Sequence, residues 1–263
     1  MNERWIETRR GLRIRIFELG TSGSPLVWLH GEAGLLSSEP LLERLAARHR
    51  VIAPEWPGYG ETRGEELLED MLDFALHGWD VIEALELDAR PALLGHSMGG
   101  MIAAEMACLA PRSLERLVLV SALGLWIDSH PIPDLFATLP FDLPALLFHD
   151  PARGVAALTG GLDFSSMEAL QRFLIGNARR LGTAGKILFP IPNRRVVKRL
   201  YRATTPALVL WGREDRLTPV LYAERWQALL PAARCERIAN AGHMLPYEQP
   251  DAAAEAVEKF LTA

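Results

Sequence analysis

The sequence is poor in the features that mark several classes of protein. It has two cysteines, Cys108 and Cys235, in 263 residues. Two are too few for a disulfide framework, and they predict buried thiols of the kind found in a reducing compartment. No apolar run approaches the ~20 residues of a membrane-spanning helix, and the first residues lack the apolar core of a signal peptide. We therefore expect a cytoplasmic protein that does not act at a membrane.

Positive charge is also scarce. The chain has 28 Lys and Arg against 33 Asp and Glu, a formal net charge of −5. That balance offers no broad basic face and argues against nucleic acid as a partner. Cysteine and histidine spacings match no metal motif, so we expect neither a metal nor a cofactor. Hydrophobic residues at 49% and charged residues at 23% are ordinary for a globular α/β domain with a sizeable core.

The most informative segment that is present is a serine bracketed by glycines. The run Gly95-His96-Ser97-Met98-Gly99 follows the apolar residues 91–94. This pattern is typical of a nucleophile elbow, a turn from a buried strand into a helix that exposes a serine hydroxyl. Glycines fit beside a strained serine, because larger side chains would collide with the strand and helix. Ser97 is therefore the candidate nucleophile.

A serine hydroxyl needs a general base, and the base needs an acid that orients it. The apolar run 208–212 predicts a buried strand, and the loop after it holds Glu214 and Asp215. Further along, His243 follows Gly242 in a segment without helical or strand periodicity, after a strand-like run. These patterns make His243 the candidate base and leave the two carboxylates as candidate acids.

An oxyanion hole requires two main-chain donors, one of them from the residue after the serine. Met98 supplies that one. The second is expected from the loop that begins at His30, with the Glu32 N–H preferred and the Ala33 N–H as the alternative. A carboxylate beside a developing oxyanion would be repulsive, so we expect the Glu32 side chain to point elsewhere, holding the loop or a water molecule.

Apolar runs alternate with helical patterns along most of the chain, which favours a mainly parallel sheet with helices on both faces. The first two runs predict a hairpin. Every candidate residue then lies at the carboxyl edge of the sheet, where open α/β sheets bind ligands. The strands are expected at about 4–7, 12–19, 25–29, 50–54, 91–95, 114–120, 207–211 and 233–238.

Residues 123–196 interrupt this alternation with a segment rich in Pro, Phe and Leu. We interpret it as a helical cap inserted between two parts of the core, residues 1–122 and 197–263. Its apolar residues exceed what a solvated excursion would carry, so they are expected to line an acyl pocket together with neighbours from the core. The residues predicted to line the pocket are His30, Leu123, Trp126, Phe136, Leu143 and Met244.

Taken together, these segments resemble the α/β-hydrolase fold superfamily, in the broad group of microbial carboxylesterases and meta-cleavage-product hydrolases. The resemblance implies an α/β-hydrolase fold with a mainly parallel eight-stranded sheet, Ser97 as nucleophile, Asp215 as acid and His243 as base. It also implies a small-molecule substrate. The matching segments are His30-Gly31, Pro57-Gly58-Tyr59-Gly60, Gly95-His96-Ser97-Met98-Gly99-Gly100, Trp211-Gly212-Arg213-Glu214-Asp215, Gly242-His243 and Tyr247-Glu248-Gln249-Pro250.

Departures from the group's pattern bear on the choice of reaction. The carbon–carbon hydrolases usually carry a Gly-rich oxyanion loop and a Trp after the histidine, where this chain has Glu32-Ala33 and Met244. We therefore expect a serine hydrolase of carboxylic esters with small to medium apolar acyl groups. The alternatives are a carbon–carbon hydrolase of ring-cleavage dienoates and a non-catalytic receptor on the same scaffold. The pattern leaves monomer and homodimer equally open.

Overall fold

The computed structural model describes residues 1–35, 38–159 and 166–263. Within these ranges the strands form one eight-stranded sheet in the order β1-β2-β4-β3-β5-β6-β7-β8. The predicted mainly parallel sheet is confirmed, and its strands begin and end within two residues of the expected positions. The strands are β1 (Asn2–Glu7), β2 (Arg13–Leu19), β3 (Pro25–Leu29), β4 (Arg50–Pro54), β5 (Ala92–His96), β6 (Arg116–Val120), β7 (Ala207–Gly212) and β8 (Ala233–Ile238).

The pairing of the strands follows from their burial. The amphipathic strands β1 and β2 form the predicted antiparallel hairpin at one edge, and β2 also pairs antiparallel with β4. The remaining pairs are all parallel. The central strands β5, β6 and β7 are almost continuously apolar, because helices cover both faces of the sheet there.

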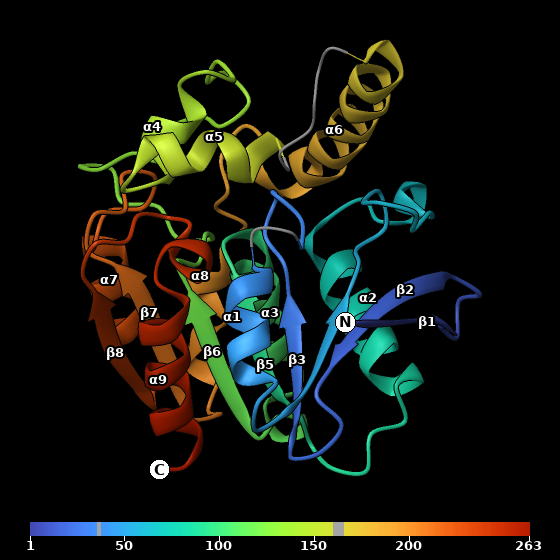
Figure 1. Ribbon diagram of the computed structural model, residues 1–263. Coiled ribbons are helices and arrows are strands. Elements are labelled where there is room, and N and C mark those ends of the chain that lie inside the picture. The colour runs from blue at the N-terminus through green and yellow to red at the C-terminus, as the bar shows by residue number, and fades with distance from the viewer. Residues whose placement is uncertain (36–37, 160–165) are drawn as a thin grey trace.

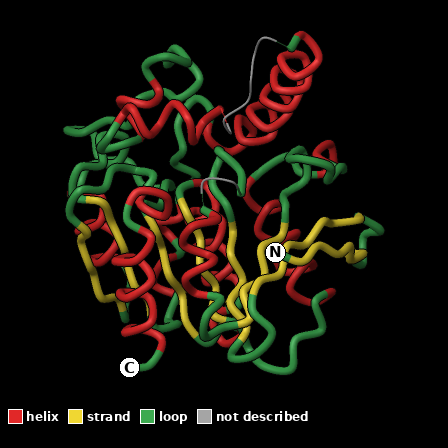
Figure 2. Tube along the Cα trace, viewed as in Figure 1, coloured by secondary structure: helices red, strands yellow, loops and turns green. Residues whose placement is uncertain are grey.

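Two groups of helices cover the two faces of the sheet. In Figure 1, α1 and α9 lie together on one face and α2, α3 and α7 on the other. Figure 2 shows the strands enclosed between these helical layers. The helices are α1 (Glu39–Leu45), α2 (Met71–Ala84), α3 (Met98–Leu109), α4 (Leu143–Leu147), α5 (Pro151–Thr159), α6 (Met167–Leu188), α7 (Leu221–Leu229), α8 (Leu245–Glu248) and α9 (Pro250–Leu261).

The alternation of side chains along the strands divides the apolar interior into two cores. In β3, Val27 and Leu29 pack into the core that contains α2, α3 and α7. Leu26 and Trp28 pack into the opposite core, with α1 and α9. Since successive strand residues point to opposite faces, a uniformly apolar strand supplies both cores at once.

The chain between β6 and β7 contains α4, α5 and α6, which lie beyond the carboxyl ends of the strands (Figures 1 and 2). Helix α6 is tied to the loop before α2, because Arg179 Nη2 lies 2.7 Å from Glu65 Oε1 and Lys186 Nζ donates to Leu68 O at 2.8 Å. The interpretation of residues 123–196 as a cap remains a prediction. Residues 160–165 of this segment lie outside the described residues.

Close packing of α3 against β3 positions the turn at Ser97. A Cβ added to Gly99 would lie 2.1 Å from the carbonyl oxygen of Leu29, and one added to Gly95 would lie 2.4 Å from that of Gly99. These neighbours are main-chain atoms of β3 and α3, which the packing of helix on sheet holds in place. The glycines predicted around the serine are therefore required by the approach of helix to strand.

We expect Gly99→Ala to destabilise the fold by about 3 kcal/mol, because a methyl group there overpacks main-chain atoms. For a chain of this size that loss lowers Tm by roughly 6–12 °C. The matched control is Gly182→Ala on the exposed side of α6, where an added Cβ meets nothing within 4 Å; it should raise stability by about 0.5–1 kcal/mol. Thermal denaturation measures both, and equal Tm values for the two variants would contradict the packing argument.

Candidate active site

Ser97 occupies the turn between β5 and α3 in a conformation that few non-glycine residues adopt. Its φ is 51° and its ψ is −116°, and such strain is of order 1–3 kcal/mol. Three main-chain hydrogen bonds hold it: Ser97 N donates to Val120 O at 3.0 Å, and Leu123 N and Met101 N each donate to Ser97 O at 3.1 Å. Met98 is the first residue of α3, so its N–H has no acceptor within the helix.

The residues predicted as nucleophile, base and acid form one hydrogen-bonded line. Nε2 of His243 lies 2.8 Å from Ser97 Oγ, and Nδ1 of His243 lies 2.9 Å from Asp215 Oδ2. The side chains of His243 and Asp215 are fully buried. Asp215 also accepts hydrogen bonds from the main-chain N–H groups of Leu217 and Thr218 and from the Thr218 hydroxyl. These three donors engage both carboxylate oxygens, so Asp215 is an acceptor toward the imidazole, and Nδ1 of His243 carries the hydrogen between them.

The rival acid, Glu214, has a different role. Its Oε2 accepts the main-chain N–H of Ala241 at 3.0 Å. The bond joins the loop after β7 to the loop that carries His243. In this structure the hydrogen-bond partner of His243 is therefore Asp215, and Glu214 bonds to the main chain.

A buried carboxylate that the sequence analysis did not assign fixes the histidine loop. Glu248 accepts from Gly242 N at 2.7 Å and from Asp150 N at 3.0 Å. It thereby joins the loop to the start of α5. His96 adds a second support, since its Nε2 donates to the carbonyl oxygen of His243 at 2.8 Å. In the sequence, Glu248 is marked only by lying in segment 247–250, one of the segments that resemble the family. Its role as a hydrogen-bond acceptor depends on the fold and is not visible in the sequence.

Burial and nearby negative charge shift the pKa values of the histidines of this region in opposite directions. Burial lowers the pKa of His243, but the charge and hydrogen bond of Asp215 and the charge of Glu32 raise it overall above the ordinary 6.5. At His30 and His96 the charge of Glu32 and a main-chain hydrogen bond act in the same direction but do not offset burial. Burial lowers the pKa of each to about 4, so both rings are neutral at physiological pH.

The prediction that the Glu32 side chain points elsewhere is wrong. Oε2 of Glu32 lies 2.7 Å from Ser97 Oγ, so the carboxylate points at the serine itself. Burial raises the pKa of Glu32, but the charge of His243 and the hydrogen bond from Ser97 are among the causes that lower it overall. The expected repulsion arises only when an oxyanion develops during the reaction, so it does not keep the carboxylate away from the serine in the free protein. Arg180 of α6 donates to the Glu32 carbonyl oxygen at 2.8 Å and anchors the loop.

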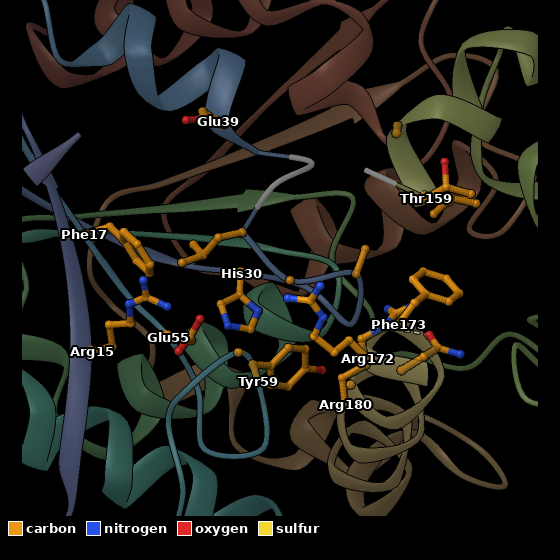
Figure 3. A pocket seen from close by; sticks show the side chains of 18 of the residues that line it. Arg15, Phe17, His30, Glu39, Glu55, Tyr59, Thr159, Arg172, Phe173 and Arg180 are labelled. Atoms are coloured by element: carbon orange, nitrogen blue, oxygen red, sulfur yellow. Dashed lines mark hydrogen bonds between the residues drawn. The ribbon is translucent and has the colours of Figure 1, made fainter. Parts of the chain in front are cut away.

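A cavity of about 550 Å³ lies beside this region. Figure 3 shows Phe17, His30 and Tyr59 on the side of the sheet, and Thr159 and Phe173, from α5 and α6, on the opposite side. His30 was predicted to line the pocket and does. The other predicted residues do not line this cavity, because two are buried in the core and three pack against it. They are Leu123, Trp126, Phe136, Leu143 and Met244.

Comparison with known proteins gives the same architecture. The sequence pattern described as the alpha/beta hydrolase family matches residues 20–256. The chain belongs to the α/β hydrolase family. This hydrolase is 31% identical over 262 residues to the dihydrolipoyllysine-residue acetyltransferase component of an acetoin cleaving system from Pseudomonas putida, covering 96% of the chain and 66% of that relative. The chain thus spans just under two thirds of that protein.

For two further proteins, the match extends over nearly the whole of both chains. A 2-hydroxy-6-oxo-2,4-heptadienoate hydrolase from Pseudomonas putida is 25% identical, over 96% of this chain and 94% of the relative. The crystal structure of carboxylesterase CesB from Bacillus subtilis superposes with a TM-score of 0.72 at 23% identity, covering 99% of this chain and 92% of that one. The latter likeness concerns the fold.

In the part of the chain that the structure describes, no helix is long and apolar enough to cross a membrane. Among the same residues, no three His, Cys, Asp or Glu side chains are grouped as ligands for a metal ion.

We expect Asp215→Asn to slow covalent modification of Ser97 by diisopropyl fluorophosphate about 10³-fold or more, because an amide cannot hold the imidazole in the required tautomer and orientation. Glu214→Gln on the same loop is the matched control, and its rate should stay within a factor of a few of wild type. Mass spectrometry of the modified protein measures both rates. Equal slowing in the two variants would contradict the assignment of Asp215.

Proposed function

We propose that this α/β hydrolase cleaves carboxylic esters with small to medium apolar acyl groups through an acyl-enzyme on Ser97. The observation that carries the proposal is the buried line of hydrogen bonds from Ser97 through His243 to Asp215. Such a line activates a hydroxyl that is otherwise a weak nucleophile. Its three members come from loops at one edge of the sheet, which is how the chemistry is assembled from distant parts of the chain.

In the first half of the reaction, Ser97 Oγ attacks the ester carbonyl carbon while His243 Nε2 takes the hydroxyl proton. The carbonyl electron pair moves to oxygen, which the N–H groups of Met98 and Glu32 hold. Each such donor lowers the barrier by about 2.7–4 kcal/mol. The tetrahedral species collapses, the bond to the alkoxy oxygen breaks, and His243 returns its proton to release the alcohol.

The second half repeats these steps with water. His243 removes a proton from a water molecule whose oxygen attacks the acyl carbon, and the carbonyl electrons again move onto oxygen. Collapse breaks the bond to Ser97 Oγ, which recovers its proton from His243. The products are the carboxylic acid and the free serine, so the cycle consumes only ester and water.

The cavity supports an apolar acyl group of limited size. Its volume of about 550 Å³ lies within the range of small-molecule sites. Aromatic and aliphatic side chains supply much of its wall, among them Leu42, Tyr59, Leu158 and Phe173. Burial of such a group against these residues would favour binding by about 25 cal/mol per Å² of apolar surface.

A second candidate is the hydrolysis of a carbon–carbon bond in a dienoate. The curated relative of that activity matches almost end to end. Arg172 and Arg180 also reach the cavity, and a guanidinium is well suited to hold a substrate carboxylate. The departures at Glu32-Ala33 and Met244 weigh against this reaction and place it second.

Cytoplasmic residence and a monomeric or homodimeric state remain predictions. Cys108 is buried as expected, whereas Cys235 is only partly buried, because it lies on the edge strand β8. A small-molecule substrate fits the size of the cavity.

We expect wild-type protein to hydrolyse p-nitrophenyl esters, with kcat/KM highest for acyl chains short enough for the cavity. Release of p-nitrophenolate across the series from acetate to dodecanoate measures this preference. Ser97→Ala should lose about 10⁴-fold or more in kcat, because no other nucleophile replaces the hydroxyl. Equal turnover by Ser97→Ala would contradict the acyl-enzyme route.

The same preparation, given 2-hydroxy-6-oxo-2,4-heptadienoate, distinguishes the two candidates. Turnover of the dienoate is measured by the loss of its absorbance. We expect kcat/KM for the best ester to exceed kcat/KM for the dienoate. A higher kcat/KM for the dienoate than for any ester, in folded protein and with Ser97→Ala inactive, would contradict the ester proposal and support the carbon–carbon reaction.

A further inference from the structure

The hydroxyl of Ser97 makes two short contacts but has one hydrogen to give. It lies 2.8 Å from His243 Nε2 and 2.7 Å from Glu32 Oε2. Nδ1 of His243 carries hydrogen toward Asp215, so in a neutral ring Nε2 is an acceptor. An ionised Glu32 is also an acceptor only. One of the two contacts would then join two acceptors at hydrogen-bond distance, which is repulsive.

Two arrangements of hydrogen satisfy both contacts. In the first, His243 is an imidazolium that donates to Ser97 Oγ, and the serine donates to an ionised Glu32. In the second, a protonated Glu32 donates to Ser97 Oγ, and the serine donates to neutral His243. Both hold the same total number of protons. Both have one proton more than the form in which neutral His243 and ionised Glu32 coexist.

The charges around the site are consistent with this extra proton. The pKa of Glu32 is lowered overall and that of His243 raised overall, against the effect of burial in each case. These directions favour the arrangement of imidazolium and carboxylate. Asp215, on the far side of the imidazole, supplies a second negative charge, so the extra proton brings the site from two net negative charges to one.

Other titratable and charged groups that face the carboxylate do not substitute for that proton. The rings of His30 and His96 have pKa values of about 4 because they are buried. Burial raises the pKa of Tyr59 above its ordinary value, so its hydroxyl stays neutral. Arg180 is a permanent cation, but its hydrogen bonds go to Asn177 and to the main-chain oxygen of Glu32.

The same carboxylate covers the place where a substrate would react. The Glu32 main-chain N–H, predicted as an oxyanion donor, interacts with the carboxylate of its own side chain. Its neighbours His30, Ala33 and Gly34 line the cavity, whereas Ser97 does not and has no exposed surface. Oε1 of Glu32 is buried and finds no partner among the described residues, so the carboxylate is only partly satisfied in this position.

We propose that in the free protein the Glu32 carboxylate occupies the site of the substrate's carbonyl oxygen and holds one proton jointly with Ser97 and His243. This inference rests on the proposed function, in that Ser97 is taken as the nucleophile. The protein becomes competent when the shared proton leaves to water and the Glu32 side chain turns away. Ser97 then donates to neutral His243, and the Glu32 N–H is free for the substrate.

Glu32→Gln tests the shared proton, since the amide is nearly isosteric but can donate to Ser97 Oγ while remaining neutral. Loss of the charge should lower the pH at which the His243 ring titrates by about one unit or more. NMR of the labelled imidazole measures this titration without any substrate. In parallel, the acid limb of Ser97 modification by diisopropyl fluorophosphate should move to lower pH, giving about a 10-fold faster reaction at pH 6.

Glu32→Ala tests the occupancy of the site. Removing the side chain leaves the main-chain N–H in place but nothing over Ser97, so the plateau rate of modification at high pH should exceed that of wild type severalfold. A plateau equal to or below wild type would overturn the occupancy, and would mean that the carboxylate assists the reaction. A His243 titration unchanged in Glu32→Gln would overturn the shared proton.

Glu105→Gln is the matched control for loss of a buried carboxylate. Glu105 lies in α3 beyond the elbow and pairs with Arg199, away from Ser97. Its removal should leave the His243 titration and the pH profile unchanged, and equal shifts in both variants would overturn the assignment to Glu32. Absence of ester turnover together with a shifted His243 titration in Glu32→Gln would refute the proposed function and support the inference.

Discussion

The buried hydrogen bond between His243 and Asp215 is the interaction around which the site is organised. It joins two loops that follow different strands, and both side chains are fully buried. The cost of burying the carboxylate is offset by three further donors from Leu217 and Thr218. Because the pair is fixed in this way, the second nitrogen of the imidazole has a single direction available, and Ser97 lies in that direction.

The sheet makes this arrangement possible through its parallel pairing. The strands β5 and β7 end at the same edge, with β6 between them, so the loops that follow them are neighbours although they are far apart in sequence. The close approach of α3 to β3, enforced at Gly99, holds the strained serine where the imidazole can reach it. Strain at Ser97 is thus maintained by packing in the middle of the core. The fixed backbone positions and the lengths of the side chains together set the distances between Ser97, His243 and Asp215.

Much of this could be predicted from the sequence, because the signals are local. Apolar runs such as 208–212 fix the strands, and Gly95 and Gly99 mark the elbow through a steric need that neighbouring residues alone create. The contact of Glu32 with Ser97 could not be predicted in the same way. It depends on the turn of the loop after β3 and on the charge of His243, which come together only in the fold. Most residues that line the cavity could not be predicted for a related reason. Phe173 and Arg180 form part of its wall only because of the path that α6 takes over the sheet.

The acyl-enzyme is the central claim, and it can be observed directly. Protein mixed with p-nitrophenyl butyrate and quenched in acid within one turnover should carry a butyryl group, and peptide mapping by mass spectrometry should locate it on Ser97. Asp215 and His243 should carry none. Turnover without any acylated peptide, or with the acyl group on another residue, would contradict the account.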